Sequence, residues 1–220
     1  MNQIHVPAPV EQFEHRGHTV KIVLDDSPES PREWGNLGHM VCWHSRYNLG
    51  DEQPRCTPDE WFCNLACKTD ATTERSLNWL EERYYDSPDY ETRRQKIIAR
   101  ALDKVVILPL YLYDHGGITI SVCEFGDLFD SGQVGYSYAT KAMILKELGG
   151  KLLTKCKRER AKKMLRAEVA VYNQYLMGDV YGYIIEDQDD HTLDACWGFY
   201  GLDYCIEEAK LEVESRELLL

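Results

Sequence analysis

The clearest pattern in the first quarter of the chain is a recurrence of apolar residues at every second position. Val20, Ile22 and Leu24 follow this period, which predicts a strand with one buried face. A short apolar run at residues 40–44 predicts a second strand. Residues 25–51 crowd carboxylates, histidines, tryptophans and turn formers around that run, and they match no phosphate-binding loop, zinc-protease helix or nucleophile elbow. We therefore expect a long loop whose role goes beyond connecting strands.

Three helices are expected in the region that follows. Thr57 can cap a helix, Pro58 fits its first position, and Glu60 can complete a capping box. A second helix is predicted over residues 73–85, and a third is predicted to begin at Ser87 and Pro88. Together these elements predict a helical insert at residues 57–104.

The middle of the chain is predicted to be a three-stranded antiparallel meander. Residues 105–113 form a nearly continuous apolar run, which indicates a strand buried on both faces, although Pro109 cannot donate a ladder hydrogen bond. Residues 114–117 (Asp-His-Gly-Gly) suit a hairpin turn into an alternating strand at 118–122. Val134, Tyr136 and Tyr138 mark the third strand.

The last third of the chain predicts two helices, a hairpin and a closing helix. A short helix is expected to end at Gly149 and Gly150, and a long amphipathic helix follows it. Residues 180–185 and 193–199 predict a hairpin, and residues 202–213 predict the closing helix. Blocks of helix between hairpins, without a repeated crossover pattern, predict an α+β fold: antiparallel sheet built from hairpins, a helical insert and a long basic helix.

Length and composition predict one folded domain over residues 1–220. The apolar fraction of 44% is enough for a core. No run approaches the roughly 18 apolar residues of a membrane span, and the first residues carry no basic start or apolar signal core. We therefore expect no membrane partner and a place in the cytoplasm.

Charge separates one segment from the rest of the chain. The formal net charge is −12, which argues against nucleic acid as the general partner. Residues 151–166 nevertheless hold eight basic residues and one acid, so direct nucleic-acid binding is expected only there, if at all. A solvated helix face is the plainer interpretation. The basic residues are Lys151, Lys155, Lys157, Arg158, Arg160, Lys162, Lys163 and Arg166.

Several strings in the chain resemble a family of bacteriophage and mobile-element proteins of unassigned role. They are DDSPESPREWGNLGHMVCWHSRYNLGDE, LPLYLYDHGGITIS, DSGQVGY, GDVYGYIIE and CWGFYG, and they span most of the chain. The chain has Gly35 and His39 where the family more often has Asp and Thr, and Asp-Leu-Phe at 127–129 where it often has Cys-Pro-Trp. The resemblance implies a viral or mobile-element context, and it supplies no catalytic residues.

A divalent metal site is one chemical hypothesis for the strand ends. A cluster of carboxylates and imidazoles there would suit metal-assisted hydrolysis. Turn formation is the stronger interpretation, because Asp side chains bond nearby backbone amides. The candidate ligands are Asp25, His44, Asp51, Asp114 and Asp130.

The cysteines and tryptophans carry weaker signals. Cys63 and Cys67 lie one helical turn apart near Cys56, but structural zinc typically needs two close pairs, so buried thiols are favoured. Trp43 and Trp197 fall in strand-like runs and are expected in the core, whereas Trp34 lies in a polar loop and suits contact with a partner.

Two classes of function remain open, beside a third, structural hypothesis of a host-takeover or virion accessory protein whose aromatic loop assembles with itself. The first is a binding protein that antagonises a host protein complex handling nucleic acid, through an acidic surface that imitates nucleic acid or blocks a basic groove. The second is a small metal-dependent hydrolase or nuclease, and the sequence favours the first. No cofactor is expected beyond a possible divalent metal. The binding residues proposed from sequence are Trp34, Glu29, Glu33, Arg32 and Asp51.

Overall fold

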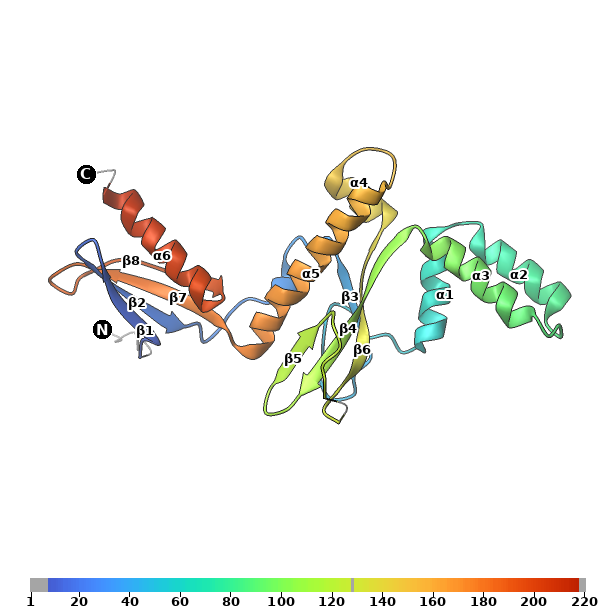
Figure 1. Ribbon diagram of the computed structural model, residues 1–220, viewed down its shortest axis with the longest axis horizontal. Coiled ribbons are helices and arrows are strands. Elements are labelled where there is room, and N and C mark those ends of the chain that lie inside the picture. The colour runs from blue at the N-terminus through green and yellow to red at the C-terminus, as the bar shows by residue number, and fades with distance from the viewer. Residues whose placement is uncertain (1–7, 128, 218–220) are drawn as a thin grey trace. The chain divides into compact units, whose positions relative to one another are not determined.

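Two antiparallel four-stranded sheets and six α-helices form the described part of the chain, residues 8–127 and 129–217 of this computed structural model (Figure 1). The predicted α+β class is therefore confirmed. The residues group into two compact units. Unit 1 runs to Trp34 and resumes at residues 116–119 and from Ala170 onward, and unit 2 holds residues 35–115 and 120–169. The single domain expected over residues 1–220 stays a prediction, and each unit is described by itself.

Unit 1 is a four-stranded sheet with one helix on one face. Its strands β1 (Glu11–His15), β2 (His18–Leu24), β7 (Val180–Glu186) and β8 (Thr192–Tyr200) lie in the order β1-β2-β7-β8. The helix is α6 (Leu202–Glu217), which follows β8 directly. The two hairpins meet through the antiparallel pairing of β2 with β7.

The core of unit 1 lies between this sheet and α6. The apolar period that predicts a strand at Val20 and Ile22 continues across the ladder, because Val20 pairs with Ile185 and Ile22 pairs with Tyr183. All four side chains are buried against α6. The helix contributes small or branched side chains at helical spacing, namely Cys205, Ala209 and Val213.

The second sheet corrects the predicted meander. Its strands β3 (His39–Cys42), β6 (Ser131–Thr140), β4 (Val105–Asp114) and β5 (Ile118–Ser121) lie in the order β3-β6-β4-β5. β6 therefore pairs with β4 and not with β5, so the predicted meander is wrong. β4 and β6 have ten residues each whereas β5 has four, and pairing the two long strands forms more ladder hydrogen bonds.

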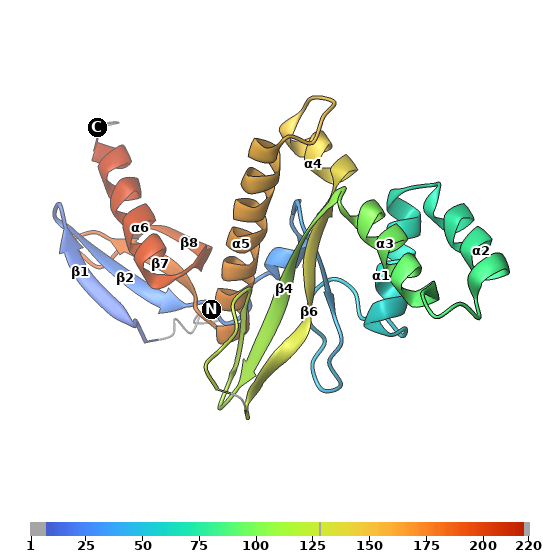
Figure 2. The same ribbon diagram turned by 45° about the vertical axis from the view of Figure 1, so that its right-hand side comes forward.

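Helices cover both faces of the second sheet (Figure 2). On one face, Val106 and Leu108 pack with α4 (Lys141–Leu148) and with the part of α5 (Lys155–Met177) that belongs to unit 2. On the other face, the alternate residue Val105 packs against α1 (Pro58–Thr69). β4 is thus buried on both faces, as its continuous apolar run predicts.

The predicted capping box of the helical insert is confirmed. The Thr57 hydroxyl accepts from the Glu60 amide at 3.3 Å, and the Glu60 carboxylate accepts from the Thr57 amide at 2.9 Å. These bonds satisfy amides that the first turn of α1 leaves without intrahelical partners. The start of the helix is therefore encoded locally.

The other helices of the insert are α2 (Thr73–Tyr84) and α3 (Tyr90–Leu102). The predicted start of the third helix at Ser87 and Pro88 is wrong, because α3 begins at Tyr90. The Ser87 hydroxyl bonds to the Asp89 carboxylate and caps no amide. No helix in the described residues is both long and apolar enough to cross a membrane.

A glycine allows β3 and β6 to approach each other. A Cβ atom on Gly135 would lie 2.0 Å from the carbonyl oxygen of Val41, which is backbone and cannot move aside. A Cβ atom on Gly132, in the same strand, would meet nothing within 4 Å. The close approach of the two backbones therefore requires glycine at position 135 but not at position 132.

We expect Gly135→Ala to lower the free energy of unfolding by about 2–3 kcal/mol, the upper part of the range for overpacked sites. Gly132→Ala is the matched control, and it should leave the urea unfolding midpoint almost unchanged. Circular dichroism during urea titration measures both variants. Equal midpoints for the two variants would contradict the close approach of β3 and β6.

Candidate functional site

The loop after β2 is shaped by local side-chain hydrogen bonds. Asp25 accepts a hydrogen bond from the Ser27 amide at 3.0 Å, and Ser30 accepts one from the Arg32 amide at 3.3 Å. The second bond caps a short 3₁₀ turn, Pro31–Glu33. Asp25 therefore acts as a turn former, which the sequence favours over a role as a metal ligand.

The predicted binding residues at positions 29–34 lie together on this turn. The Trp34 ring meets the Tyr200 ring edge to face, with centroids 5.1 Å apart, and the Tyr200 hydroxyl donates to the Glu29 carbonyl. Trp34 remains 47% exposed, Glu29 and Glu33 are exposed, and Arg32 is half-buried. Tyr200 thus anchors a polar turn that presents an indole ring.

Glu168 of α5 holds the chain that enters β3. Its two carboxylate oxygens accept from the amides of Leu37, at 2.7 Å, and Gly38, at 2.9 Å. A Cβ atom on Gly38 would lie 2.2 Å from a side-chain atom of Leu165, so any larger residue would force side chains of the helix to shift. The Asn-Leu-Gly string of the sequence is therefore a docking point for α5.

Asp51, the remaining predicted binding residue, lies in unit 2. Its carboxylate accepts from the Met40 amide at 2.7 Å and lies 3.5 Å from the His39 ring. The opposite nitrogen of His39 lies 3.4 Å from the Glu52 carboxylate. Sequence reasoning did not select His39 or Glu52. Glu52 lies beside β3 because it forms an isolated β-bridge with Val41. No pattern in the sequence predicts this bridge.

His44 is held in one orientation by backbone amides. Its Nδ1 accepts from the amides of Arg46, at 3.3 Å, and Tyr47, at 3.1 Å, and the ring stacks on Tyr47 with centroids 5.0 Å apart. An imidazole nitrogen that accepts hydrogen bonds carries no proton, so the neutral ring carries its proton on Nε2. Neither nitrogen of that ring has a lone pair left for a metal ion.

Asp114 and Asp130 also have partners. Asp114 accepts from the Arg46 guanidinium at 2.5 Å and from the Tyr47 hydroxyl, and Asp130 lies 2.9 Å from a ring nitrogen of His115. A guanidinium on Asp114 offsets the negative charge that would attract a cation.

His44, Asp114 and Asp130 line one polar cavity of about 320 Å³. Asp25 and Asp51 are not among its lining residues, and Asp25 belongs to the other unit. The described residues contain no group of three or more His, Cys, Asp or Glu side chains placed to hold a metal ion. The structure thus brings together three of the five candidate ligands, and each of the three already has a hydrogen-bond or ion-pair partner.

The cysteines have the environment of structural thiols. All eight are free, and Cys42 and Cys205 are buried. Burial and the neighbouring Cys63 raise the pKa of Cys67, and burial raises the pKa of Cys205 to about 12. Because thiolates are the nucleophiles and metal ligands, these shifts oppose both roles. Cys56, Cys63 and Cys67, for which the sequence favours buried thiols, are half-buried, and Cys123, Cys156 and Cys196 are exposed.

Trp43 and Trp197 differ in burial although both lie in strand-like runs. Trp43 is half-buried in the core beside Trp61, and its ring nitrogen donates to the Cys56 carbonyl at 2.8 Å. Trp197 is 47% exposed on β8, at the edge of its sheet, and its ring lies over Gly182. The core position expected for Trp197 is therefore wrong.

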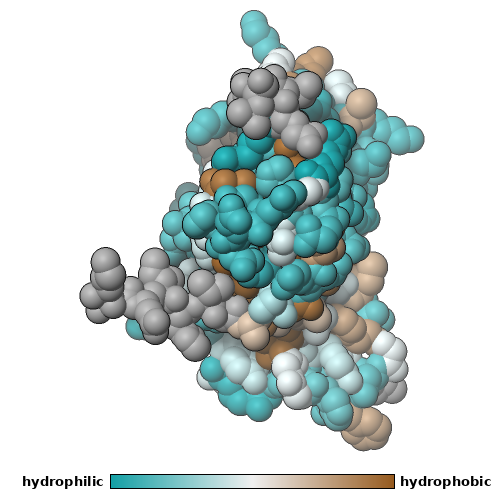
Figure 3. All heavy atoms as spheres, turned by 90° about the vertical axis from the view of Figure 1, so that its left-hand side faces the viewer, coloured by the Kyte–Doolittle hydropathy of each residue, from teal (hydrophilic) through white to brown (hydrophobic). Residues whose placement is uncertain are grey.

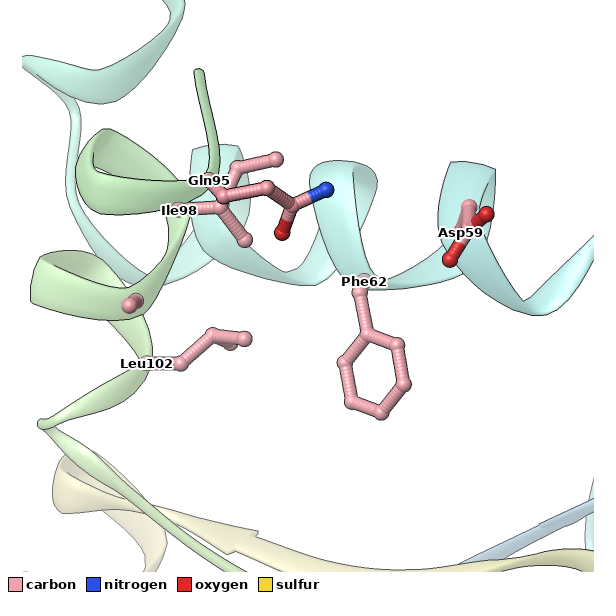
Figure 4. A pocket seen from close by; sticks show the side chains of 6 residues that line it. Asp59, Phe62, Gln95, Ile98 and Leu102 are labelled. Atoms are coloured by element: carbon pink, nitrogen blue, oxygen red, sulfur yellow. The ribbon is translucent and has the colours of Figure 1, made fainter. Parts of the chain in front are cut away.

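A groove between α1 and α3 is lined mainly by apolar side chains (Figure 4). Phe62 of α1 points into it, and Ile98 and Leu102 of α3 form its other side. Asp59 is the one acidic residue among its lining side chains. The groove has space for an apolar group but no assembled acid and base.

The negative charge is concentrated in unit 1. Unit 1 carries 18 acidic and five basic residues, whereas unit 2 carries 19 acidic and 20 basic residues. The net charges are therefore −13 and +1. The side of the molecule that carries α6 in Figure 1 is mostly hydrophilic in Figure 3, with small separate hydrophobic areas. The sequence alone does not show this separation of charge, because unit 1 combines segments from the two ends of the chain.

Comparison with known proteins gave no match: no protein-family model, curated protein or solved structure is significantly similar to this chain.

We expect the His44 ring to carry its proton on Nε2 at pH 7.5 and to keep it there when Zn²⁺ is added. Two-dimensional NMR of the ring nitrogens measures this state directly. The exposed His115 is the internal comparison, because it lacks the two amide donors. A proton on Nδ1, or loss of the Nε2 proton on addition of Zn²⁺, would contradict the geometry.

We expect Glu168→Gln to lower the free energy of unfolding by about 2–3 kcal/mol, because the amides of Leu37 and Gly38 lose a charged acceptor. Urea unfolding checks the change. Glu159→Gln on the exposed face of α5 is the control, and it should leave the midpoint unchanged. Equal destabilisation by both variants would show that the amides do not depend on Glu168.

Proposed function

We propose that this chain is an accessory protein of a phage or mobile element that binds and antagonises a host protein complex handling nucleic acid. The acidic surface of unit 1 is the proposed contact. The observation that carries the proposal is the net charge of −13 on unit 1 against +1 on unit 2. A charge confined to one compact unit creates a directed field, whereas charge spread evenly serves solubility.

Two elements of unit 1 supply exposed carboxylates. The turn between β7 and β8 exposes Asp189 and Asp190, and α6 exposes Asp203 and Glu207. Among the described residues, no ion-pair partner is found for these four side chains, so their charge faces solvent. Such a surface is complementary to the basic groove of a protein that binds nucleic acid.

The turn at residues 29–34 supplies the second part of the proposed contact. Trp34 offers a half-exposed ring held by Tyr200, and Glu29 and Glu33 add negative charge beside it. Aromatic anchors surrounded by polar side chains are typical of binding hot spots. The proposed surface therefore combines steering by charge with an apolar anchor.

The long helix α5 is the place for any direct contact with nucleic acid. Lys155, Arg160, Lys163 and Arg166 are exposed on its unit 2 portion, where Glu159 is the acidic residue that interacts with Lys155 and Arg166. One short row of cations gives weaker binding than an extended basic surface. We therefore propose protein binding as the main activity, in the cytoplasm of the host cell.

The alternative function is a metal-dependent hydrolase or nuclease. The cavity shared by His44, Asp114 and Asp130 favours it. The hydrogen bonds that these side chains already form weigh against a metal-dependent enzyme. This alternative predicts that His44→Ala abolishes hydrolysis without affecting the capture of a partner.

The proposal is tested by capturing partners from host lysate at low and at high salt, followed by mass spectrometry. The affinity of the captured complex is then measured for the parent chain and for the double variant Asp189→Lys, Glu207→Lys. We expect its affinity to fall about tenfold or more at low salt, because both substitutions reverse charge on the proposed surface.

The matched control is the double variant Glu81→Lys, Glu82→Lys. It changes the net charge by the same amount on α2, in unit 2, where both side chains are exposed. Retained binding by this control together with loss by the unit 1 variant would support the proposal. Equal binding by both variants would overturn it.

A further inference from the structure

A second cavity in unit 2, of about 470 Å³, is lined by lysines and apolar side chains. It lies where β6 ends and α4 begins, beside the last turn of α1. Its volume falls within the range of small-molecule sites. It shares no lining residue with the polar cavity at His44. The lining residues are Leu65, Lys68, Thr69, Lys104, Tyr138, Thr140, Lys141, Ala142, Met143 and Leu145.

The charge of this lining is positive. Three lysines from separate segments meet there, and none of the ten lining residues is acidic. Asp70 bonds to Lys104 at 2.5 Å, and this bond holds the pKa of Asp70 well below its usual range. Lys68 and Lys141 have no ion-pair partner among the described residues. Two uncompensated ammonium groups match the charge of a dianion.

Backbone geometry adds a donor at the same place. The first three amides of α4 have no intrahelical acceptor. The Lys141 amide donates to the Lys104 carbonyl, and the Met143 amide donates to the Thr140 hydroxyl. The remaining amide is that of Ala142, which lines the cavity and is exposed. The positive end of the helix dipole favours an anion there.

The rest of the cavity wall is apolar. Leu65 is buried, and Met143 and Leu145 are half-buried, on opposite elements of the lining. Inorganic phosphate would leave this wall in contact with water. An anion with an attached apolar or aromatic group would cover it, and covering it is favourable.

We infer that this cavity binds a small organic phosphate: the dianionic phosphoryl group lies between Lys68, Lys141 and the Ala142 amide, and the apolar part of the ligand packs on Leu65 and Leu145. The inference does not rest on the proposed function, because it concerns unit 2 and a different ligand class. A single cavity of this size suits one phosphoryl group, whereas nucleic acid presents a row of phosphates.

The test is calorimetric titration of the full chain with phenyl phosphate, inorganic phosphate and phenol at fixed ionic strength. We expect phenyl phosphate to bind more tightly than either of the other two probes. Lys68→Met and Lys141→Met should each weaken its binding roughly 10-fold to 100-fold, the usual effect of losing one hydrogen bond to a charged group. Leu145→Asp should abolish binding, because it places a carboxylate in the cavity.

Lys146→Met is the matched control. This exposed lysine lies on α4 outside the lining, so the variant should bind phenyl phosphate like the parent chain. Circular dichroism verifies that each variant is folded. Equal loss with Lys146→Met, or binding of phenyl phosphate no tighter than that of inorganic phosphate, would overturn the inference. Binding of an oligonucleotide without binding of phenyl phosphate would overturn it as well.

Discussion

The attachment of residues 37–38 to Glu168 is the interaction on which the geometry of unit 2 depends. A carboxylate that accepts two successive amides fixes both the position and the direction of the chain as it enters β3. β3 in turn pairs with β6 through the close approach at Gly135. The segment that carries His39 and His44 is therefore positioned by a helix 130 residues further along the chain. A loop held in this way can keep polar side chains in fixed orientations without a metal ion.

Local features of the fold could be predicted from sequence, and long-range ones could not. The capping box at Thr57 is complete within four residues, and the apolar period of β2 predicts the burial of Val20 and Ile22, although Leu24 at its end is 41% exposed. The pairing of β6 with β4 follows from the relative lengths of three strands, and no single segment encodes it. Trp197 shows the same limit, because its exposure depends on β8 being an edge strand. Amphipathic pattern identifies elements, whereas neighbours decide which of their faces are covered.

The candidate site shows why residue types alone overstate chemistry. The sequence proposes five metal ligands because carboxylates and imidazoles recur at strand ends. In the structure, Asp25 forms a turn, Asp51 accepts a β3 amide and Asp114 binds Arg46. Each of these bonds gives the carboxylate a structural partner in place of a metal ion. Burial and hydrogen bonding thus decide between a ligand and a structural residue, and neither is visible in spacing.

Separation of charge reconciles an acidic protein with a site for anions. A net charge of −12 distributed evenly would oppose phosphate binding anywhere on the surface. Because unit 2 is nearly neutral, the field at Lys68 and Lys141 is set by nearby groups, and salt screens charges more than about 8 Å away at physiological ionic strength. Binding of an organic phosphate and binding of a basic partner then involve different units. At fixed ionic strength, an organic phosphate should therefore compete only at the lysine cavity and leave the contacts of unit 1 unchanged.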